Sequence, residues 1–276
     1  MKIADIDLVI EAALKEDMPE GDITSESIIP EDSVSRAVFL AKEDGTLAGI
    51  DIARRVFEKI GQDILFEKHL EDGSEIRSGD HLADLKGNSI TLLKGERTAL
   101  NFLQRMSGIA TLTRKYVLAI KGYDAKILDT RKTTPLLRRL EKYAVKMGGG
   151  ENHRFCLSDM VMIKDNHLQI AGSITEAVRK ARERVKPGIK IEIETTTLEE
   201  VQEAVQSGVD MIMLDNMPPA KMKEAVLWVS GRVPLEASGN IRLSRIKEIA
   251  ATGVDFISVG SLTHSFDSLD ISLEFL

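Results

Sequence analysis

Basic side chains are concentrated between residues 127 and 164, although the chain as a whole is acidic. The stretch "ILDTRKTTPLLRRLEKYAVKMGGGENHR" is rich in Lys and Arg around a Gly-Gly-Gly turn, and "IKDNH" follows it in a chain of net charge −7. Arg offers a planar fork for carboxylate or phosphate, and Lys offers a point charge. This local concentration predicts a pocket for a ligand with several negative charges, lined by Arg131, Lys132, His153, Arg154 and Lys164.

Acidic and small residues follow further along the chain. Glu194 in "IEIETTT" and Asp215 in "MIMLDN" stand at the ends of two successive predicted strands. Two carboxylates facing a polyanion pocket suit Mg²⁺, which takes few protein carboxylates and keeps its waters for a phosphate ligand. "EASGN" and "SVGSLTHS" offer small residues and backbone N–H groups before helices, an arrangement that receives a phosphate in many barrels. The residues concerned are Ser238, Gly239, Asn240, Gly260 and Ser261.

Several of these features also have a purely structural interpretation. Taken alone, "LRRLEKYAVK" is typical of a solvated helix face with Glu141 paired to neighbouring cations, so Arg138 and Arg139 receive no functional role. A single His is more often structural than catalytic, and the histidines lack the HxxxH and HExxH spacings of a zinc site. Lys164 is ambiguous, since a lysine at the end of a buried barrel strand could form a Schiff base.

The first third of the chain predicts a mixed domain. "DIDLVIEAALKED" has helical spacing, whereas "PEGDITSESIIPEDS" is expected to break regular structure. From Val34 to about Lys86, short alternating runs separated by turns indicate strands, with one helical insert, "IARRVFEKIG". "ERTALNFLQRMSGIATLTRKYVLAI" predicts one or two helices, joined near Ser107 and Gly108, that bridge two domains.

Beyond this bridge, strands typical of a buried sheet alternate with helices. The expected strands are "AKILDT", "MVMIKDN", "KIEIETT", "DMIMLDN", "VPLEAS" and "DFISVG". Such alternation predicts a parallel sheet, either a barrel or a doubly wound sheet. Nearly every strand ends in polar residues, and the carboxyl ends of barrel strands share one rim, so we favour the barrel. With only six or seven strands it would be incomplete.

Length and composition exclude other classes of protein. The 276 residues, 43% of them hydrophobic, suffice for one large barrel or two domains. The excess of acidic residues does not favour binding to nucleic acid or to an anionic membrane. No apolar run approaches the roughly 20 residues that span a bilayer. The start does not resemble a signal peptide, and the single cysteine, Cys156, suits a reducing compartment. We therefore expect a cytoplasmic protein.

In their order along the chain, the motifs resemble those of the quinolinate phosphoribosyltransferase family, also called carboxylating nicotinate-nucleotide pyrophosphorylases. The resemblance covers nearly the whole chain, and "DTRKT…GGGENHR" followed by "IKDNH" is its most specific part. It implies an α/β fold: an N-terminal α/β sandwich domain and an incomplete, six or seven stranded α/β barrel. We place the sandwich at residues 1–105 and the barrel at 106–265, and leave open a return of the tail, 266–276, to the first domain.

The resemblance also implies a reaction in de novo NAD biosynthesis. The phosphoribosyl group of phosphoribosyl pyrophosphate passes to quinolinate, giving nicotinate mononucleotide, pyrophosphate and CO₂, with Mg²⁺ as cofactor. Arg97, in "ERTALN", resembles the arginine that reaches into the neighbouring subunit's site of a homodimer, which could assemble further into a hexamer.

The roles of the other residues follow from the same resemblance. Those implied to act in catalysis are Lys132, Lys164, Glu194 and Asp215. Four residues would bind the two quinolinate carboxylates: Arg131, His153, Arg154 and Lys164. Lys132 would serve the pyrophosphate or the ring, and Glu194 and Asp215 the ribose hydroxyls and the metal. The 5′-phosphate would contact Ser238, Gly239, Asn240, Gly260 and Ser261.

Three other functions stay open at this stage. A relative on the same scaffold, associated with molybdate transport genes, could use phosphoribosyl pyrophosphate with another acceptor. A Schiff-base aldolase could use Lys164. A non-enzymatic polyanion-binding protein is disfavoured, because acidic strand ends weaken anion binding unless a metal or a cation-like transition state needs them.

Overall fold

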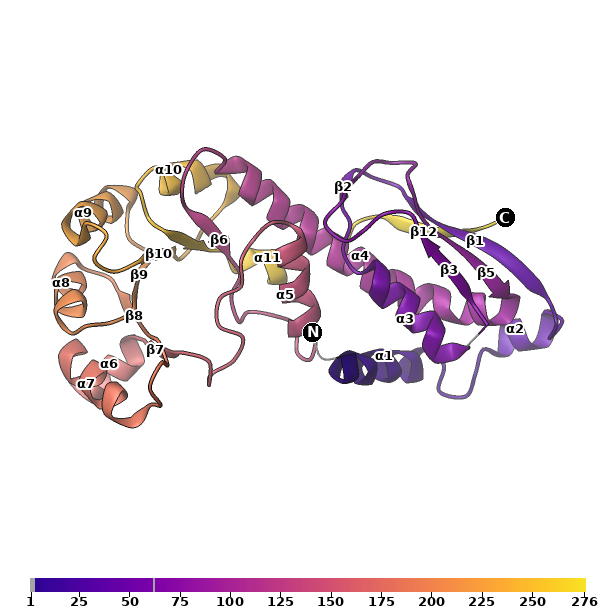
Figure 1. Ribbon diagram of the computed structural model, residues 1–276, viewed down its shortest axis with the longest axis horizontal. Coiled ribbons are helices and arrows are strands. Elements are labelled where there is room, and N and C mark those ends of the chain that lie inside the picture. Colours follow the sequence, from indigo (N-terminus) through magenta and orange to yellow (C-terminus); the bar gives the residue numbers. More distant parts are fainter. Residues whose placement is uncertain (1–2, 62) are drawn as a thin grey trace. The chain divides into compact units, whose positions relative to one another are not determined.

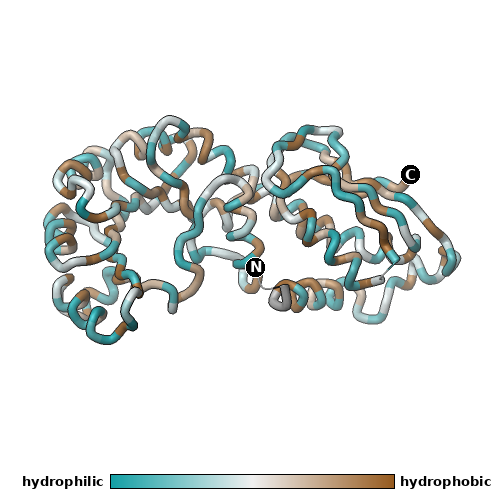
Figure 2. Tube along the Cα trace, in the orientation of Figure 1, coloured by the Kyte–Doolittle hydropathy of each residue, from teal (hydrophilic) through white to brown (hydrophobic). Residues whose placement is uncertain are grey.

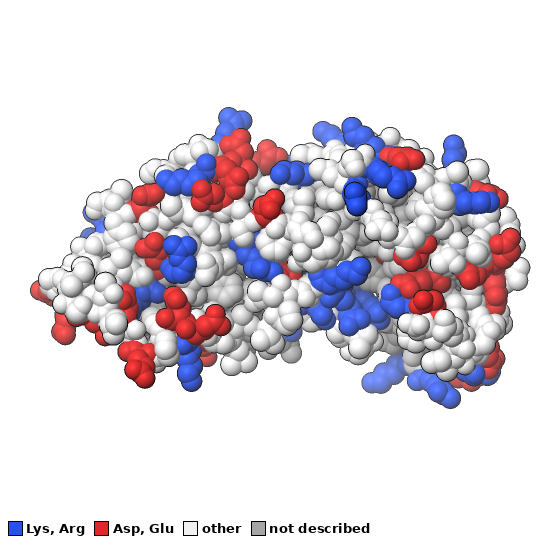
Figure 3. Space-filling view, turned by 180° about the vertical axis from the view of Figure 1, so that it is seen from behind, with Lys and Arg blue, Asp and Glu red and all other residues white. Residues whose placement is uncertain are grey.

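The computed structural model describes residues 3–61 and 63–276, with side chains from residue 6 onwards, and divides into two compact units. The first unit comprises the chain up to Arg114 together with residues 133–149 and 265–276. The second unit comprises residues 115–132 and 150–264. The basic segment is therefore shared between the units. Acidic and basic side chains are interspersed over the face of the molecule shown in Figure 3.

An antiparallel sheet in the order β12-β1-β5-β3 forms the centre of the first unit. Its strands are β1 (Val34–Ala41), β3 (Leu65–Lys68), β5 (His81–Asn88) and β12 (Ile271–Phe275). A smaller pair joins β2 (Gly45–Thr46) to β4 (Glu75–Ile76). The C-terminal strand β12 lies beside β1 with Ile271 opposite Ala41, so the tail completes the sheet of the first unit.

The helices of the first unit are α1 (Ile3–Asp17), α2 (Ile23–Ile28), α3 (Ile50–Ile60), α4 (Ser89–Ala119) and α5 (Arg138–Met147), with α4 continuing into the second unit. Helix α3 packs on the sheet through Phe57, whose ring centroid lies 6.3 Å from that of Phe39 and 6.4 Å from that of Phe66. The bridge is thus one continuous helix, α4, across the joint expected at Ser107 and Gly108.

Helix α2 and the helical conformation at Gly108 were not expected from the sequence. The segment expected to be irregular contains α2, because the Asp22 carboxylate accepts hydrogen bonds from the N–H groups of Thr24 and Ser25 and so caps the helix. Gly108 stays helical and allows close packing: a Cβ there would lie 2.1 Å from the carbonyl oxygen of Asp267.

The second unit is a six-stranded parallel sheet in the order β6-β11-β10-β9-β8-β7. Its strands are β6 (Lys126–Leu128), β7 (Val161–Ile163), β8 (Ile191–Thr195), β9 (Met211–Asp215), β10 (Leu235–Ser238) and β11 (Phe256–Ser258). Figure 1 shows helices on the outer side of this curved row of strands. The helices of the unit are α6 (Asp165–Ala171), α7 (Ile174–Arg184), α8 (Leu198–Gln206), α9 (Pro219–Val229), the short 3₁₀ helix η1 (Leu243–Arg245), α10 (Ile246–Ala250) and α11 (Ser261–His264). This confirms the incomplete α/β barrel.

Strands β6 and β7 are the two edges of this sheet. A segment without regular structure continues the β6 edge: Glu151 donates from its N–H to the carbonyl of Ile127 at 2.8 Å, and its own carbonyl accepts from the N–H of Asp129 at 3.1 Å. Because these bonds satisfy backbone groups that an open edge would leave exposed, residues 150–155 form part of the barrel wall on that side.

Apolar and polar residues are interleaved along the chain of both units (Figure 2). Among the described residues, no helix has the length and apolarity needed to cross a lipid bilayer.

Candidate active site

The rim at the carboxyl ends of the barrel strands collects most of the residues predicted from the sequence. All six strands run parallel, so their carboxyl ends lie on one side of the sheet. Asp215 pairs in register with Ser238, and Thr195, directly after Glu194, pairs with Leu214. The rim residues are Arg131, Lys132, Lys164, Glu194, Asp215, Ser238, Gly239, Asn240, Gly260 and Ser261. Arg97 belongs to the first unit, where it is exposed on α4.

Lys164 and Glu194 form an ion pair across the ends of β7 and β8. The Lys164 side chain is 42% exposed and that of Glu194 16%, so the pair is accessible from the rim. Glu194 thus holds the amine that a Schiff base would need as a free nucleophile. This geometry therefore disfavours the aldolase alternative.

The loop after β6 holds Lys132 against the neighbouring strand end. The Lys132 N–H donates to Thr130 Oγ1 at 3.0 Å, and its carbonyl accepts from Thr263 Oγ1 at 2.8 Å. A Cβ built on Gly260 would lie 3.2 Å from Lys132 Cδ. The small residue after β11 thus leaves room for the lysine stem, and the two predicted site residues are direct neighbours.

A second group of contacts links the ends of β9 and β10. Gly239 has φ 93°, and a Cβ there would lie 2.3 Å from Asn216 Oδ1. That amide oxygen accepts from Asn240 Nδ2 at 3.0 Å, and the Asn216 N–H donates to Ser238 O at 2.9 Å. Asn216 itself has φ 53°. It was noted in the sequence only as a polar strand end, and its left-handed backbone at a strand terminus marks it as part of the site.

Ser261 supplies a polar atom suited to a ligand. Its Oγ is buried and meets no hydrogen-bond partner among the described residues. A buried hydroxyl without a partner is costly, so an anion or water that accepts from it would relieve that cost.

His153 points its ring into the barrel interior. Nε2 lies 2.9 Å from Glu192 Oε2 and 3.3 Å from Glu236 Oε2. The His153 side chain is 6% exposed, and both glutamate side chains are fully buried. Glu192 and Glu236 lie on β8 and β10. Although they belong to the polar residues expected at the strand ends, both are buried in the interior, because the sequence carries no signature that separates interior from rim.

The charges of this buried cluster depend on one another. Burial alone would lower the pKa of His153, but hydrogen bonds to Glu192 and Glu236 and their charges outweigh it and raise the pKa to about 9. Burial raises the pKa of Glu192 to about 7, opposed by the hydrogen bond from His153. The N–H of Arg154 lies 2.7 Å from His153 Nδ1, a contact that suits the neutral ring. The two carboxylates favour the charged ring against this contact.

Arg154 connects the wall segment to the other edge of the sheet. Its Nη1 donates to the Met160 carbonyl at 3.0 Å, just before β7, and its Nη2 lies 3.5 Å from Met162 Sδ. Burial and the nearby Arg131 lower the pKa of Arg154. Two half-buried guanidinium groups so close together are suited to a ligand with several negative charges.

Two sets of residues could hold a metal ion. Glu194 and Asp215 offer half-buried carboxylates at the ends of adjacent strands, as oxygen-preferring Mg²⁺ requires. The ligand atoms of His153, Glu192 and Glu236 lie within 4.8 Å of one another, but an ion there would have to displace the proton that the ring holds against the two carboxylates. The rim pair therefore fits magnesium better.

Helix α5, which carries the middle of the basic segment, is fixed within the first unit. Glu141 is fully buried and accepts from Arg105 of α4 and from the Thr134 N–H, and Lys142 is also buried. The expectation of a solvated face with local pairs is therefore wrong for these two residues, because both are buried and Glu141 pairs with Arg105 of α4.

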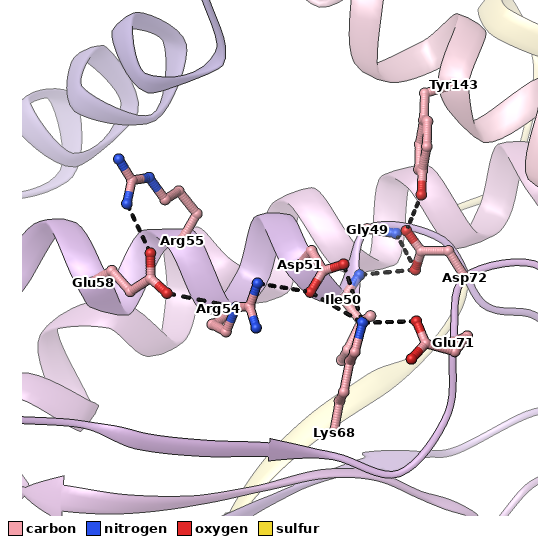
Figure 4. Close-up of polar contacts among 10 residues, drawn as sticks. All are labelled: Gly49, Ile50, Asp51, Arg54, Arg55, Glu58, Lys68, Glu71, Asp72 and Tyr143. Carbon is pink, nitrogen blue, oxygen red and sulfur yellow. Dashed lines mark hydrogen bonds and ion pairs between the residues drawn. The ribbon is translucent and has the colours of Figure 1, made fainter. Parts of the chain in front are cut away.

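Tyr143 ties the same helix to α3. Its hydroxyl donates to Asp72 Oδ2 at 2.8 Å, while Asp72 Oδ1 accepts from the N–H groups of Gly49 and Ile50 at 2.8 and 3.0 Å (Figure 4). One carboxylate thus caps α3 and holds α5.

Comparison with known proteins places this geometry in a family context. Models for the N-terminal and C-terminal domains of quinolinate phosphoribosyl transferase match residues 22–107 and 109–274. A probable carboxylating nicotinate-nucleotide pyrophosphorylase of Bacillus subtilis is 46% identical over 259 residues, with 94% of this chain and 89% of the relative covered. The mitochondrial decarboxylating quinolinate phosphoribosyltransferase 2 of Nicotiana glauca is 43% identical, with 98% and 82% covered. The crystal structure of NadC from Streptococcus pyogenes superposes with TM-score 0.96 at 41% identity, with 100% and 99% covered.

Proposed function

The chain belongs to the quinolinate phosphoribosyltransferase family, and on this premise we propose that its barrel rim is the receptor of the quinolinate dianion. The reaction is decarboxylating phosphoribosyl transfer from phosphoribosyl pyrophosphate to quinolinate, which gives nicotinate mononucleotide, pyrophosphate and CO₂. One observation carries the proposed site: Arg131, Arg154 and Lys164 flank one mouth of the barrel, beside the carboxylate of Glu194.

Binding of quinolinate would break the Lys164–Glu194 ion pair. One quinolinate carboxylate pairs with the Lys164 ammonium, and the Glu194 carboxylate then faces the ribose. The pyridine nitrogen then attacks ribose C1 as pyrophosphate leaves, and positive charge develops at C1. Glu194 and Asp215 stabilise that charge, so the acidic pair acts mainly in the transition state.

Magnesium is the proposed cofactor. The donor set fits it, since Glu194 and Asp215 are carboxylates at an accessible rim with oxygen ligands alone. When bound, the ion would neutralise charge on the pyrophosphate leaving group. Lys132, whose stem lies against Gly260, is suited to contact the same group.

The ends of β10 and β11 are the proposed 5′-phosphate site. The Ser261 hydroxyl is buried without a partner in the described part of the chain, and Gly239 and Asn240 are held by Asn216. Gly260, where a Cβ would lie 3.2 Å from Lys132 Cδ, and Ser238 are part of the same strand ends. A phosphate here would accept the Ser261 hydrogen bond and place C1 toward the acidic pair.

Substrate choice follows from charge. A site built to pair two carboxylates leaves buried cations uncompensated when nicotinate, with one carboxylate, occupies it. After the nitrogen is quaternised, the adjacent carboxylate leaves as CO₂, the pyridinium charge stabilises the electron pair left on the ring carbon, and a proton from water then takes the place of the carboxylate.

We also propose a homodimer in which Arg97 completes the partner's site. Arg97 is exposed on α4, and a third arginine would complete the charge balance for a dianion and a pyrophosphate. Further assembly into a hexamer is compatible with this arrangement.

Product release tests the reaction and its acceptor. The purified protein is given phosphoribosyl pyrophosphate, Mg²⁺ and either quinolinate or nicotinate, and pyrophosphate and CO₂ are measured. Equal release of both products with quinolinate alone is the expected result. Folded protein that is inactive with both acids would favour the relative with another acceptor.

A further inference from the structure

The wall segment at residues 150–155 carries one side chain deep into the barrel. The His153 N–H donates to Asp129 Oδ1 at 2.9 Å, beyond the end of β6. The ring then extends to Glu192 on β8 and Glu236 on β10. The segment is thus held at one edge strand and at two interior strands. The next residue, Arg154, reaches the carbonyl of Met160 before the other edge strand.

We propose that Glu192 and Glu236 are positioning residues for quinolinate, which hold the His153 ring as a buried anchor and thereby fix the Arg154 guanidinium at the barrel mouth. On this view His153 acts from within the barrel and need not touch the substrate. The proposal rests on the assignment of Arg154 to the quinolinate site made above.

The position of Glu192 separates it from the acidic pair of the rim. Glu192 and Glu194 are two residues apart on β8, so their side chains face the same side of the sheet. Glu192 lies roughly 6–7 Å deeper, at a rise of about 3.3 Å per residue. A side chain at that depth is too far below Glu194 to share its ligands, and it meets the His153 ring instead.

The cost of burying this cluster indicates a purpose beyond stability. Both carboxylates are fully buried, and the His153 ring, whose Nε2 lies 2.9 Å from Glu192 Oε2 and 3.3 Å from Glu236 Oε2, is their main compensation. Apolar side chains of similar volume usually stabilise a core as well or better. The two carboxylates, however, hold the His153 ring in one orientation. The Arg154 guanidinium, which follows it in the chain, needs a fixed orientation to pair with a substrate carboxylate.

The electrostatic surroundings of Arg154 agree with this role. Glu192 and Glu194 both raise its pKa, against burial and Arg131, which lower it. Glu192 therefore compensates the crowding of two arginines in addition to holding the ring. Loss of either glutamate should loosen Arg154, without removing any group that contacts phosphoribosyl pyrophosphate.

Kinetics of isosteric variants test the proposal. Glu192→Gln and Glu236→Gln are each expected to raise the KM for quinolinate about tenfold or more, since small displacements of a positioning group have effects of this size. The KM for phosphoribosyl pyrophosphate should stay within about twofold. Glu151→Gln is the matched control: it lies in the same segment, but its side chain is 50% exposed and pairs with Lys126. It should leave both constants unchanged.

Three results would overturn the proposal: unchanged quinolinate KM in both glutamine variants, an equal rise of the two KM values, or a stoichiometric metal ion that Glu236→Gln removes. If a glutamine variant does not fold, Glu192→Asp and Glu236→Asp keep the charge, and an intermediate quinolinate KM supports the anchor. Arg154→Gln separates the assignment of Arg154 to the quinolinate site from the role of the two glutamates. A normal quinolinate KM in Arg154→Gln contradicts the assignment of Arg154. A raised quinolinate KM in Arg154→Gln together with a normal one in both glutamate variants contradicts only the positioning role of Glu192 and Glu236.

Discussion

Lys164 and Glu194 neutralise each other across the ends of β7 and β8. In the proposed reaction, a substrate carboxylate binds the Lys164 ammonium and so opens this pair. Lys164→Ala should therefore lower kcat/KM by about a hundredfold or more, roughly 3 kcal/mol of transition-state stabilisation. The thermal unfolding midpoint should change little, since the pair is accessible to solvent.

Steady-state kinetics with a melting curve measure both effects. Lys221→Ala is the control, because Lys221 forms a comparable exposed pair with Glu224 on α9, and it should behave as wild type. Near-normal kinetics of Lys164→Ala would remove Lys164 from the site.

The acidic pair should determine the magnesium requirement. Removal of the metal with a chelator is expected to abolish turnover, and added Mg²⁺ should restore it. Glu194→Gln and Asp215→Asn should each need about tenfold more Mg²⁺ for half-maximal activity, or lose activity altogether. A magnesium titration of initial rates measures this. Glu224→Gln should titrate as wild type, and the same Mg²⁺ dependence in all four proteins would argue against the assignment.

The buried histidine should make stability depend on pH. The pKa of His153 is raised to about 9, so the charged ring contributes stability that is complete below its unfolded pKa of about 6.5 and is lost as pH rises through 9. The unfolding midpoint should therefore fall between pH 7 and 9, by roughly 5 °C for this term.

Melting curves across that range check the sign. Glu236→Gln removes one of the charges that raise the pKa, so its decline should be shallower. Glu151→Gln should keep the wild-type slope. An unfolding midpoint of wild type that rises from pH 7 to 9, or equal slopes in all three proteins, would contradict this charge state.

Arg97 should act in the partner's site. Arg97→Ala and Lys164→Ala are each expected to be inactive alone, whereas a mixture that exchanges subunits should recover about a quarter of wild-type activity, because half of the dimers then hold one intact site. Activity measured after mixing tests this. The control combines both changes in one chain and mixes it with Lys164→Ala, which can form no intact site. No recovery in the first mixture would place Arg97 elsewhere.

Much of the rim could be predicted from the sequence because a parallel sheet brings strand ends together. Lys164 and Asp215 each follow an apolar run, and Glu194 stands near the end of an alternating one, so their common location needs only the fold class. The helix α2 was missed because its polar residues were interpreted as turn signals, although Asp22 is a suitable cap.

The interior of the barrel could not be predicted in the same way. Glu192 and Glu236 alternate with apolar residues, and only the entry of the His153 ring from a distant loop gives them a partner. Likewise, the burial of Glu141 depends on Arg105, which lies 36 positions earlier on another helix. Such pairings arise from tertiary packing, and the hydrophobic periodicity of the sequence does not predict them.

Equilibrium binding of the two pyridine acids tests the central claim most directly. Calorimetric titration of quinolinate and of nicotinate into the wild-type protein, with Mg²⁺ present, gives both affinities under one set of conditions. We predict that quinolinate binds at least about a hundredfold more tightly, since nicotinate leaves one cationic subsite unpaired. Equal affinity for the two acids would contradict a rim built to receive a dianion.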